Sequence, residues 1–332
     1  MNQDLMLRLF RSIDGEADDD LVKVAATIID DERKKGHNRL ADRLKNILEK
    51  NIKTHQSVKG ELKNIFASNV SIPTDKRFKI PLAVEVDREK LRHDMVLSPD
   101  IEVRIARIEK EYVARERLAH FGLAPKRKIL LHGAPGCGKS MSAERIAWNI
   151  GLPFLKVKFE AIISSYLGES ASNLKAMFES IREYPCVLLL DEFDFIAKSR
   201  ENKQDVGEMH RIVNILLNVL EEYEGPGIII ATTNLEGAID KALFRRFDDI
   251  IELPKPRKEE ISEILKATVG SIQTAKDISW NKLAANMIGF SAALIVKIAN
   301  DAAKLAVIKG GNIIQEYHFQ ESLKENYLYI KS

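Results

Sequence analysis

Apolar residues recur at helical spacing through most of the first 68 residues. From Leu21 to Ile28 they fall at i, i+3, i+4 and i+7, which places them on one face of a helix. A second apolar face follows over residues 40–48, and Gly36 between the two suits a helix C-terminal cap. The pattern predicts a helical module over residues 1–68 with a charged exterior.

Residues 69–97 break this periodicity. Pro73 and Pro81 flank irregular sequence, and the one alternating stretch, Leu82–Val86, predicts a linker with at most one short strand. Ser98-Pro99-Asp100 then has the features of a helix start: a capping serine, a proline at the first helical position and an acid near the positive end of the dipole. A new domain is therefore expected to begin at Ser98.

From residue 128 onward, short unbroken apolar runs alternate with longer amphipathic stretches. Runs of this kind are typical of parallel strands buried on both faces, and the stretches between them suit crossover helices. The predicted strands are 129–132, 154–159, 187–190, 228–231 and 249–253, and the predicted helices are 139–150, 170–182 and 207–223. The order predicts an α/β fold over residues 98–255, with a doubly wound parallel sheet of five strands. The strand pattern stops after Pro256, and residues 256–332 are predicted to form a small helical domain.

Composition narrows the class of protein. Lysine and arginine number 51 against 49 aspartates and glutamates, so the net charge of +2 gives no general affinity for nucleic acid. Two cysteines cannot form a disulfide framework and favour a reducing compartment. No apolar run approaches the ~18 residues that span a bilayer, and the first residues lack the pattern of a signal peptide. These features predict a cytoplasmic protein without a membrane span.

One loop carries a phosphate-binding pattern. The stretch GAPGCGKS fits G-x-x-x-x-G-K-[ST] at every fixed position and lies between a predicted strand and a predicted helix. Glycines there let backbone N–H groups surround phosphates, and the helix N-terminus adds positive potential. An unrelated glycine-rich turn would not need both flanking elements. The predicted nucleotide-binding residues are Gly133, Ala134, Pro135, Gly136, Cys137, Gly138, Lys139, Ser140 and Met141.

Two carboxylates end the apolar strand at 187–190. Asp191 and Glu192 follow it directly, and the carboxyl ends of parallel strands face the ligand crevice. Ser140 and Asp191 are therefore the predicted Mg²⁺ ligands, Asp191 through water, and Glu192 is the predicted group that polarises the attacking water. An acidic pair at a strand end is common by itself, and its position in the same sheet as the phosphate loop gives it meaning.

Two further polar groups follow the strand at 228–231. Asn234 ends the segment Thr232-Thr233-Asn234 and suits either a turn or the binding of the lytic water beside the γ-phosphate. Arg245 and Arg246 suit a solvated surface, or a pair of arginines supplied to a neighbour's nucleotide.

Taken together, these motifs resemble the AAA family of ATPases, in the branch of katanin, spastin and the ATPase part of FtsH-type proteases. The resemblance runs from about Ser98 to Ser332, and the stretch Ala231–Phe247 is similar to the second region of homology that separates AAA proteins from other P-loop ATPases. It implies ATP and Mg²⁺ as cofactors and a ring, expected to be a hexamer. The residue roles that it implies are Walker A at Gly133–Ser140, Walker B at Val187–Glu192, sensor 1 at Asn234 and arginine fingers at Arg245 and Arg246.

The same resemblance implies a substrate-gripping pore loop. Ser165–Ser170 is similar to the aromatic–hydrophobic–glycine loop of hexameric AAA machines, with Tyr166, Leu167 and Gly168 at the key positions. An exposed turn capped by Ser170 is the alternative interpretation.

The chain also departs from the family pattern. Cys137 stands where threonine is usual, and Ala292 and Leu294 replace the glycine and aspartate of the lid motif. There is no H-E-x-x-H, so this chain is not itself a zinc protease of the FtsH type.

Three functions follow from this reading. The first is a homo-oligomeric ATPase that unfolds or remodels a protein substrate by threading, with residues 1–68 selecting substrate or docking an adaptor. The second is a nucleotide-dependent regulatory switch or scaffold that controls a separate effector, such as a partner protease, without threading. A nucleic-acid motor, the third, has only the local cluster Lys126-Arg127-Lys128 in its favour.

Overall fold

The chain divides into two units, Met1–Asn69 and Val70–Ser332. The structure, a computed structural model, describes residues 29, 41, 44 and 45 and the ranges 71–75, 78–163, 169–193, 206–234, 245–311 and 313–326. In the first unit the four described residues are helical, and Ile29, Ala41 and Leu44 are buried. The rest of the helical module predicted for residues 1–68 lies outside the described residues.

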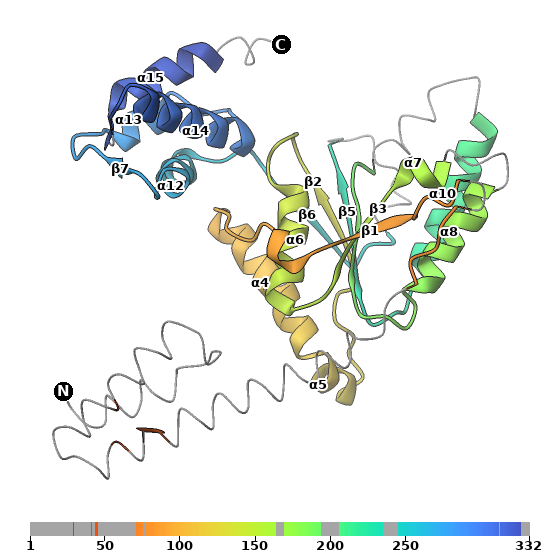
Figure 1. Ribbon diagram of the computed structural model, residues 1–332. Helices are drawn as coiled ribbons and strands as arrows, with labels where there is room; N and C mark the ends of the chain where they lie inside the picture. Colours follow the sequence, from red (N-terminus) through yellow and green to blue (C-terminus); the bar gives the residue numbers. More distant parts are fainter. Residues whose placement is uncertain are drawn as a thin grey trace. The chain divides into compact units, whose positions relative to one another are not determined.

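A six-stranded sheet forms the centre of the second unit (Figure 1). Its spatial order is β1-β3-β4-β5-β2-β6, and every neighbouring pair is parallel except β1 with β3. The strands are β1 (Ala83–Val86), β2 (Lys128–His132), β3 (Phe154–Val157), β4 (Val187–Leu190), β5 (Ile228–Thr233) and β6 (Asp249–Glu252). The predicted α/β fold is confirmed, and the five strands predicted to be parallel, β2 to β6, are parallel.

Helices cover both faces of this sheet. On one side lie α4 (Pro99–Val113) and α6 (Lys139–Ile150), and on the other lie α8 (Glu169–Ser180) and α10 (Val206–Glu222), as Figure 1 shows. The short helices α5 (Arg115–His120) and α7 (Phe159–Ile163) follow α4 and β3. All four residues of β4 and all six of β5 are buried, because each strand packs against helices on both sides.

The last part of the chain is a small domain around its own apolar core. It contains α12 (Lys258–Thr268), α13 (Trp280–Ala285), α14 (Ala292–Ile308) and α15 (Glu316–Glu325). Ile264, Leu283, Ile298 and Phe319 from these four helices meet in the core. Two short parallel strands, β7 (Gln273–Thr274) and β8 (Ile313–Ile314), pair beside the helices.

The structure differs from the sequence prediction in several details. The sheet has six strands rather than five, because part of the predicted linker forms β1 and pairs antiparallel with β3, Ala83 opposite Val157. The strand predicted at 154–159 ends at Val157, and α7 begins at Phe159. The C-terminal domain is not wholly helical, since β7 and β8 are too short to leave an alternating pattern in the sequence.

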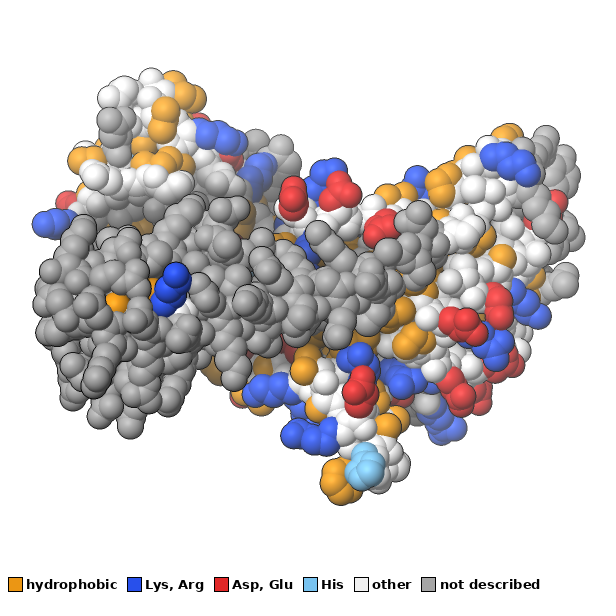
Figure 2. All heavy atoms as spheres, turned by 60° about the horizontal axis from the view of Figure 1, so that its bottom comes forward, with side chains coloured by type: hydrophobic (Ala, Val, Ile, Leu, Met, Phe, Trp, Pro, Cys, Tyr) orange, Lys and Arg blue, Asp and Glu red, His pale blue; other side chains and the backbone are white. Residues whose placement is uncertain are grey.

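Surface charge is mixed. Figure 2 shows acidic and basic side chains interspersed over the coloured part of the face that it presents. In the basic cluster at 126–128, the ammonium group of Lys126 lies 2.6 Å from a carboxylate oxygen of Asp249, and the side chain of Arg127 donates to the carbonyl of Glu224. These two cations therefore tie the start of β2 to the rest of the fold. None of the helices in the described part of the chain has the length and hydropathy that crossing a bilayer requires.

Candidate active site

The phosphate-loop motif lies where the sequence placed it, between β2 and α6. Gly133, Gly136 and Gly138 all have positive φ, at +138°, +75° and +93°. A Cβ on Gly133 would lie 2.2 Å from the carbonyl oxygen of Leu253, at the end of β6, so only glycine fits there. Pro135 and Gly136 are exposed and Cys137 is buried, while Met141 is half-buried in the first turn of α6.

Lys139 is folded back over this loop. Its side chain is buried at 7% exposure, and its ammonium group donates to the carbonyl oxygens of Gly133 at 2.8 Å and Ala134 at 2.9 Å. The charge therefore sits inside the curve of the loop, at the N-terminal end of α6. Anionic phosphate oxygens entering the loop would offer stronger acceptors than the two neutral carbonyls.

Asp191 is the centre of a hydrogen-bond cluster at the carboxyl end of β4. One carboxylate oxygen accepts from the hydroxyl of Ser140 at 2.7 Å and from the hydroxyl of Thr232 at 2.6 Å. The other oxygen accepts from the ammonium group of Lys156, on β3, at 2.6 Å. Burial by itself would raise the pKa of this carboxyl, but the three donors outweigh it, and the pKa lies below its ordinary value.

Glu192 occupies an unusual backbone conformation beside this cluster. Its φ is +54°, in the left-handed region that non-glycine residues seldom adopt. The N–H of Glu192 donates to the hydroxyl oxygen of Thr232 at 3.0 Å, and its side chain is exposed. The sheet thus brings Lys139, Ser140, Asp191 and Glu192 to one edge, as the sequence predicted.

Comparison with known proteins agrees with this arrangement. A family model described as "ATPase family associated with various cellular activities (AAA)" matches residues 129–255. An uncharacterized AAA family ATPase, y4kL of Sinorhizobium fredii, is 34% identical over 308 residues, which cover 93% of this chain and 91% of that protein. The chain belongs to the AAA family of ATPases.

A second relative is the proteasome-activating nucleotidase of Methanosarcina mazei. It is 30% identical over 251 residues, covering 73% of this chain and 59% of that protein, so the chain spans less than two thirds of its length. As an AAA ATPase, the present protein binds nucleotide and hydrolyses ATP. The narrower assignment to the branch of katanin, spastin and FtsH-type modules stays a prediction.

The remaining predicted site residues of the AAA ATPase divide into three groups. Asn234 follows β5 directly and is half-buried. Arg245 is exposed, whereas Arg246 is half-buried and its guanidinium lies 3.1 Å from a carboxylate oxygen of Glu221. The predicted pore loop, Tyr166, Leu167 and Gly168, lies outside the described residues.

The small domain of the AAA ATPase reaches the phosphate loop through the start of α14. The N–H of Ala293 donates to the carbonyl oxygen of Gly136 at 3.0 Å. A Cβ on Gly136 would come within 3.0 Å of both Ala293 and the hydroxyl of Ser291, which caps α14. The loop therefore carries a glycine here for a close approach as well as for its positive φ.

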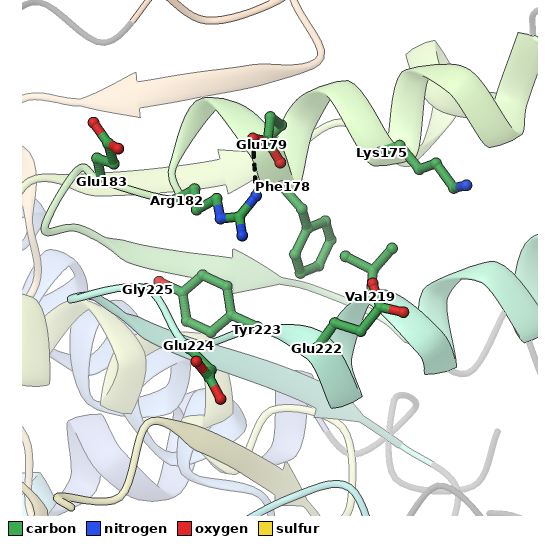
Figure 3. Close-up of a pocket in the computed structure, with 10 residues that line it drawn as sticks. All are labelled: Lys175, Phe178, Glu179, Arg182, Glu183, Val219, Glu222, Tyr223, Glu224 and Gly225. Carbon is green, nitrogen blue, oxygen red and sulfur yellow. Dashed lines mark hydrogen bonds and ion pairs between the residues drawn. The ribbon is translucent and has the colours of Figure 1, made fainter.

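A separate hollow lies at the opposite edge of the sheet. It has a volume of about 480 Å³ and sits between the C-terminal ends of α8 and α10, near the amino ends of β4 and β5. Figure 3 shows the rings of Phe178 and Tyr223 along it, with Arg182 reaching toward Glu179, 3.3 Å away. Ligands of parallel sheets bind at the carboxyl ends of the strands, so this hollow is not part of the nucleotide site.

Two residues of the hydrogen-bond cluster were not predicted as site residues. Lys156 lies inside β3, in a sequence that predicts an ordinary strand. In the sheet it pairs with Leu189, two residues before Asp191 on the same face, so its side chain can reach Asp191 only because β3 and β4 are neighbours. Thr232 belongs to a segment that the sequence singled out for Asn234, and its hydroxyl gave no signal of its own.

Proposed function

We propose that this AAA ATPase assembles as a homo-oligomeric ring, expected to be a hexamer, and uses ATP hydrolysis to thread and remodel a protein substrate. ATP hydrolysis is supported by one observation: four residues lie at the same edge of the sheet, namely Lys139, Ser140, Asp191 and Glu192. Threading of a protein substrate is supported by the relative named a proteasome-activating nucleotidase and by the sequence of the predicted pore loop.

Nucleotide binding is assigned to the loop and to the start of α6. The backbone N–H groups of Gly136–Ser140 and the ammonium group of Lys139 would hold the phosphates, with Lys139 exchanging its two carbonyl acceptors for phosphate oxygens. The start of α14 would close over the loop from the lid side, through the contact between Ala293 and Gly136.

The donor set fits Mg²⁺. The hydroxyl of Ser140 and a carboxylate oxygen of Asp191 lie 2.7 Å apart, and both are oxygen ligands of the kind that this ion prefers. The ammonium group of Lys156 already places one positive charge at this carboxylate. When bound, Mg²⁺ would neutralise charge on the phosphate oxygens, with Ser140 and Asp191 holding it directly or through water.

Hydrolysis is assigned to Glu192 and Asn234. The exposed carboxylate of Glu192 would accept a proton from the attacking water, and the amide of Asn234 would orient that water beside the γ-phosphate. Asn234 directly follows β5 and Glu192 is the second residue after β4, and these two strands are neighbours in the sheet.

Ring assembly is assigned to the arginines at 245 and 246. Arg245 is exposed, so it suits contact with the nucleotide of a neighbouring copy. Arg246 is paired with Glu221 in its own chain, which suits a supporting role behind Arg245.

Residues 1–68 would select the substrate or dock an adaptor. The cytoplasmic location stays a prediction.

Replacing Tyr166 by alanine tests threading against the regulatory switch. An aromatic side chain grips varied polypeptide through contact area, so its loss should abolish substrate-stimulated turnover and remodelling and leave basal ATP hydrolysis within twofold of the parent. Tyr317→Ala, which removes an exposed tyrosine from the C-terminal domain, is the matched control, and Lys139→Ala is the variant without nucleotide binding. If Tyr166→Ala remodels a partner as fast as the parent does, threading is wrong and the switch is the better function. Hydrolysis stimulated by DNA or RNA would instead favour a nucleic-acid motor.

A further inference from the structure

Thr232 makes three hydrogen bonds to three consecutive residues of the neighbouring strand end. Its hydroxyl donates to the carboxylate of Asp191 at 2.6 Å and accepts from the N–H of Glu192 at 3.0 Å. Its carbonyl oxygen accepts from the N–H of Phe193 at 2.7 Å. Thr232 is 1% exposed, so these bonds form away from competing water.

The backbone explains why a side chain is needed at this point. The parallel register between β4 and β5 runs as far as Leu190 opposite Ala231, and one step further on Asp191 lies beside Thr232. Glu192 then turns into the left-handed region, so β4 leaves the sheet. At this turn the Thr232 hydroxyl accepts a hydrogen bond from the N–H of Glu192. In a regular parallel pairing, a backbone carbonyl of β5 would accept that bond.

We propose that Thr232 is a positioning residue for ATP hydrolysis, because its hydroxyl holds Glu192 in the left-handed conformation that directs the Glu192 carboxylate. This inference rests on the role given to Glu192 under the proposed function. The hydroxyl uses its donor on Asp191 and an acceptor lone pair on Glu192, so serine can replace it and valine cannot. Thr233 cannot substitute for it, because successive side chains of a strand point to opposite faces.

The effect should fall on turnover rather than on nucleotide affinity. Without Thr232's hydroxyl, Asp191 keeps its bonds from Ser140 and Lys156, and Lys139 and the loop glycines are untouched. The N–H of Glu192 loses its acceptor, and the left-handed peptide loses the contact that offsets its strain. A misplacement of about 1 Å at a reacting group can cost on the order of 100-fold in rate.

The experiment compares hydroxyl-bearing and hydroxyl-free side chains of matched size. Thr232→Val should lower kcat by about 10- to 100-fold, with KM for ATP within about threefold of the parent. Thr232→Ser should stay within about threefold of the parent in kcat. Thr268→Val, which removes a threonine hydroxyl bonded to its own helix in the C-terminal domain, is the control and should leave kcat unchanged. If valine at position 232 prevents folding, Thr232→Ala against Thr232→Ser isolates the same hydroxyl.

A second comparison separates positioning from general support of the fold. In single-turnover assays, Thr232→Val should change the residual rate of Glu192→Gln less than about threefold, since a residue that acts through Glu192 has nothing left to position. An equal loss in both backgrounds, a kcat loss shared by Thr232→Ser, or full activity of Thr232→Val would each overturn the inference. If Glu192→Gln hydrolyses ATP at the parent rate, the proposed role of Glu192 fails, and the inference fails with it. If Glu192→Gln is slow while Thr232→Val is unaffected, only the inference about Thr232 fails.

Discussion

Replacing Gly133 by alanine perturbs the closest backbone approach in the phosphate loop. The new Cβ would lie 2.2 Å from the carbonyl oxygen of Leu253, well inside contact distance, on a residue whose φ is +138°. The N–H of Leu253 is bonded to the carbonyl of His132 at 2.7 Å, so Leu253 cannot move away without disturbing the pairing of β2 with β6. The strain must therefore be relieved by moving the loop.

Two terms set the size of the effect. A residue held in a disfavoured backbone region costs about 1–3 kcal/mol, and forcing an extra carbon into a filled space costs about 1–3 kcal/mol. The free energy of unfolding should fall by their sum, about 2–6 kcal/mol. In a domain of this size each kcal/mol lowers the melting temperature by about 2–4 °C, so it should fall by roughly 4–24 °C. Because the loop also binds the phosphates, ATP affinity should fall by at least about tenfold, or ~1.4 kcal/mol.

The assay pairs thermal unfolding with calorimetric titration of ATP on three proteins: the parent, Gly133→Ala and Gly122→Ala. Gly122 also has a positive φ, +70°, but a Cβ there would meet nothing within 4 Å. Its substitution should cost only the backbone term of about 1–2 kcal/mol and leave ATP affinity unchanged. If Gly133→Ala melts and binds ATP like Gly122→Ala, the close contact with Leu253 does not constrain the loop and the reasoning is wrong.

Three further predictions concern other parts of the molecule. Asp249→Asn should lower the free energy of unfolding by about 1–3 kcal/mol at pH 7, since a buried carboxylate loses its charge-assisted bonds. Burial opposes ionisation of Asp249, but its bonds to two cations hold its pKa below the ordinary value of about 4. The stability that the Asp249 carboxylate adds is therefore present above that pH and is lost as the pH falls below it. Urea titrations from pH 3 to 8 measure the difference in unfolding free energy between the parent and Asp249→Asn. Burial raises the pKa of Cys186 to about 12, so its thiol should resist iodoacetamide at pH 8 in the folded protein and react in urea, by mass spectrometry. Mixing an Arg245/Arg246 double-alanine variant with Lys139→Ala should restore part of the ATPase activity if the arginines act on a neighbour's nucleotide.

Each of these three predictions would be contradicted by one particular result. A gap between parent and Asp249→Asn that does not change with pH would mean that the carboxylate charge contributes nothing. Labelling of Cys186 in the native protein would show that the amino end of β4 opens to solvent. Mixed variants that stay as inactive as each alone would remove the support for arginines acting between copies.

The sequence predicted the part of the site that is encoded by local pattern. A glycine-rich loop between a strand and a helix, and two acids after an apolar strand, are fixed by spacing, and the rules of parallel sheets place both at one edge. In the structure Ser140 and Asp191 lie at this edge within hydrogen-bond distance of each other.

The contributions of Lys156 and Thr232 could not be predicted in the same way. Which strand lies next to β4 depends on the order of the whole sheet, and the order β3-β4-β5 is what brings these two side chains to Asp191. The left-handed turn at Glu192 has no sequence signal, because glycine or asparagine would normally mark such a position. The sequence predicts β1 only as a short strand in a linker. Two of its four residues are exposed, and its pairing with β3 joins residues that are far apart in the sequence, so no local pattern shows that β1 belongs to the sheet.

Strand β1 also determines where the chain can be shortened safely. It covers the outer side of β3, whose N–H and C=O groups would otherwise be open to pairing with another molecule. Leu82 and Ala83 are buried against the same region, so their removal would uncover apolar surface as well. A shortened protein that begins at Ser98, where the helix signal is strongest, should therefore aggregate through its bare sheet edge, whereas one that begins at Val70 keeps that edge closed.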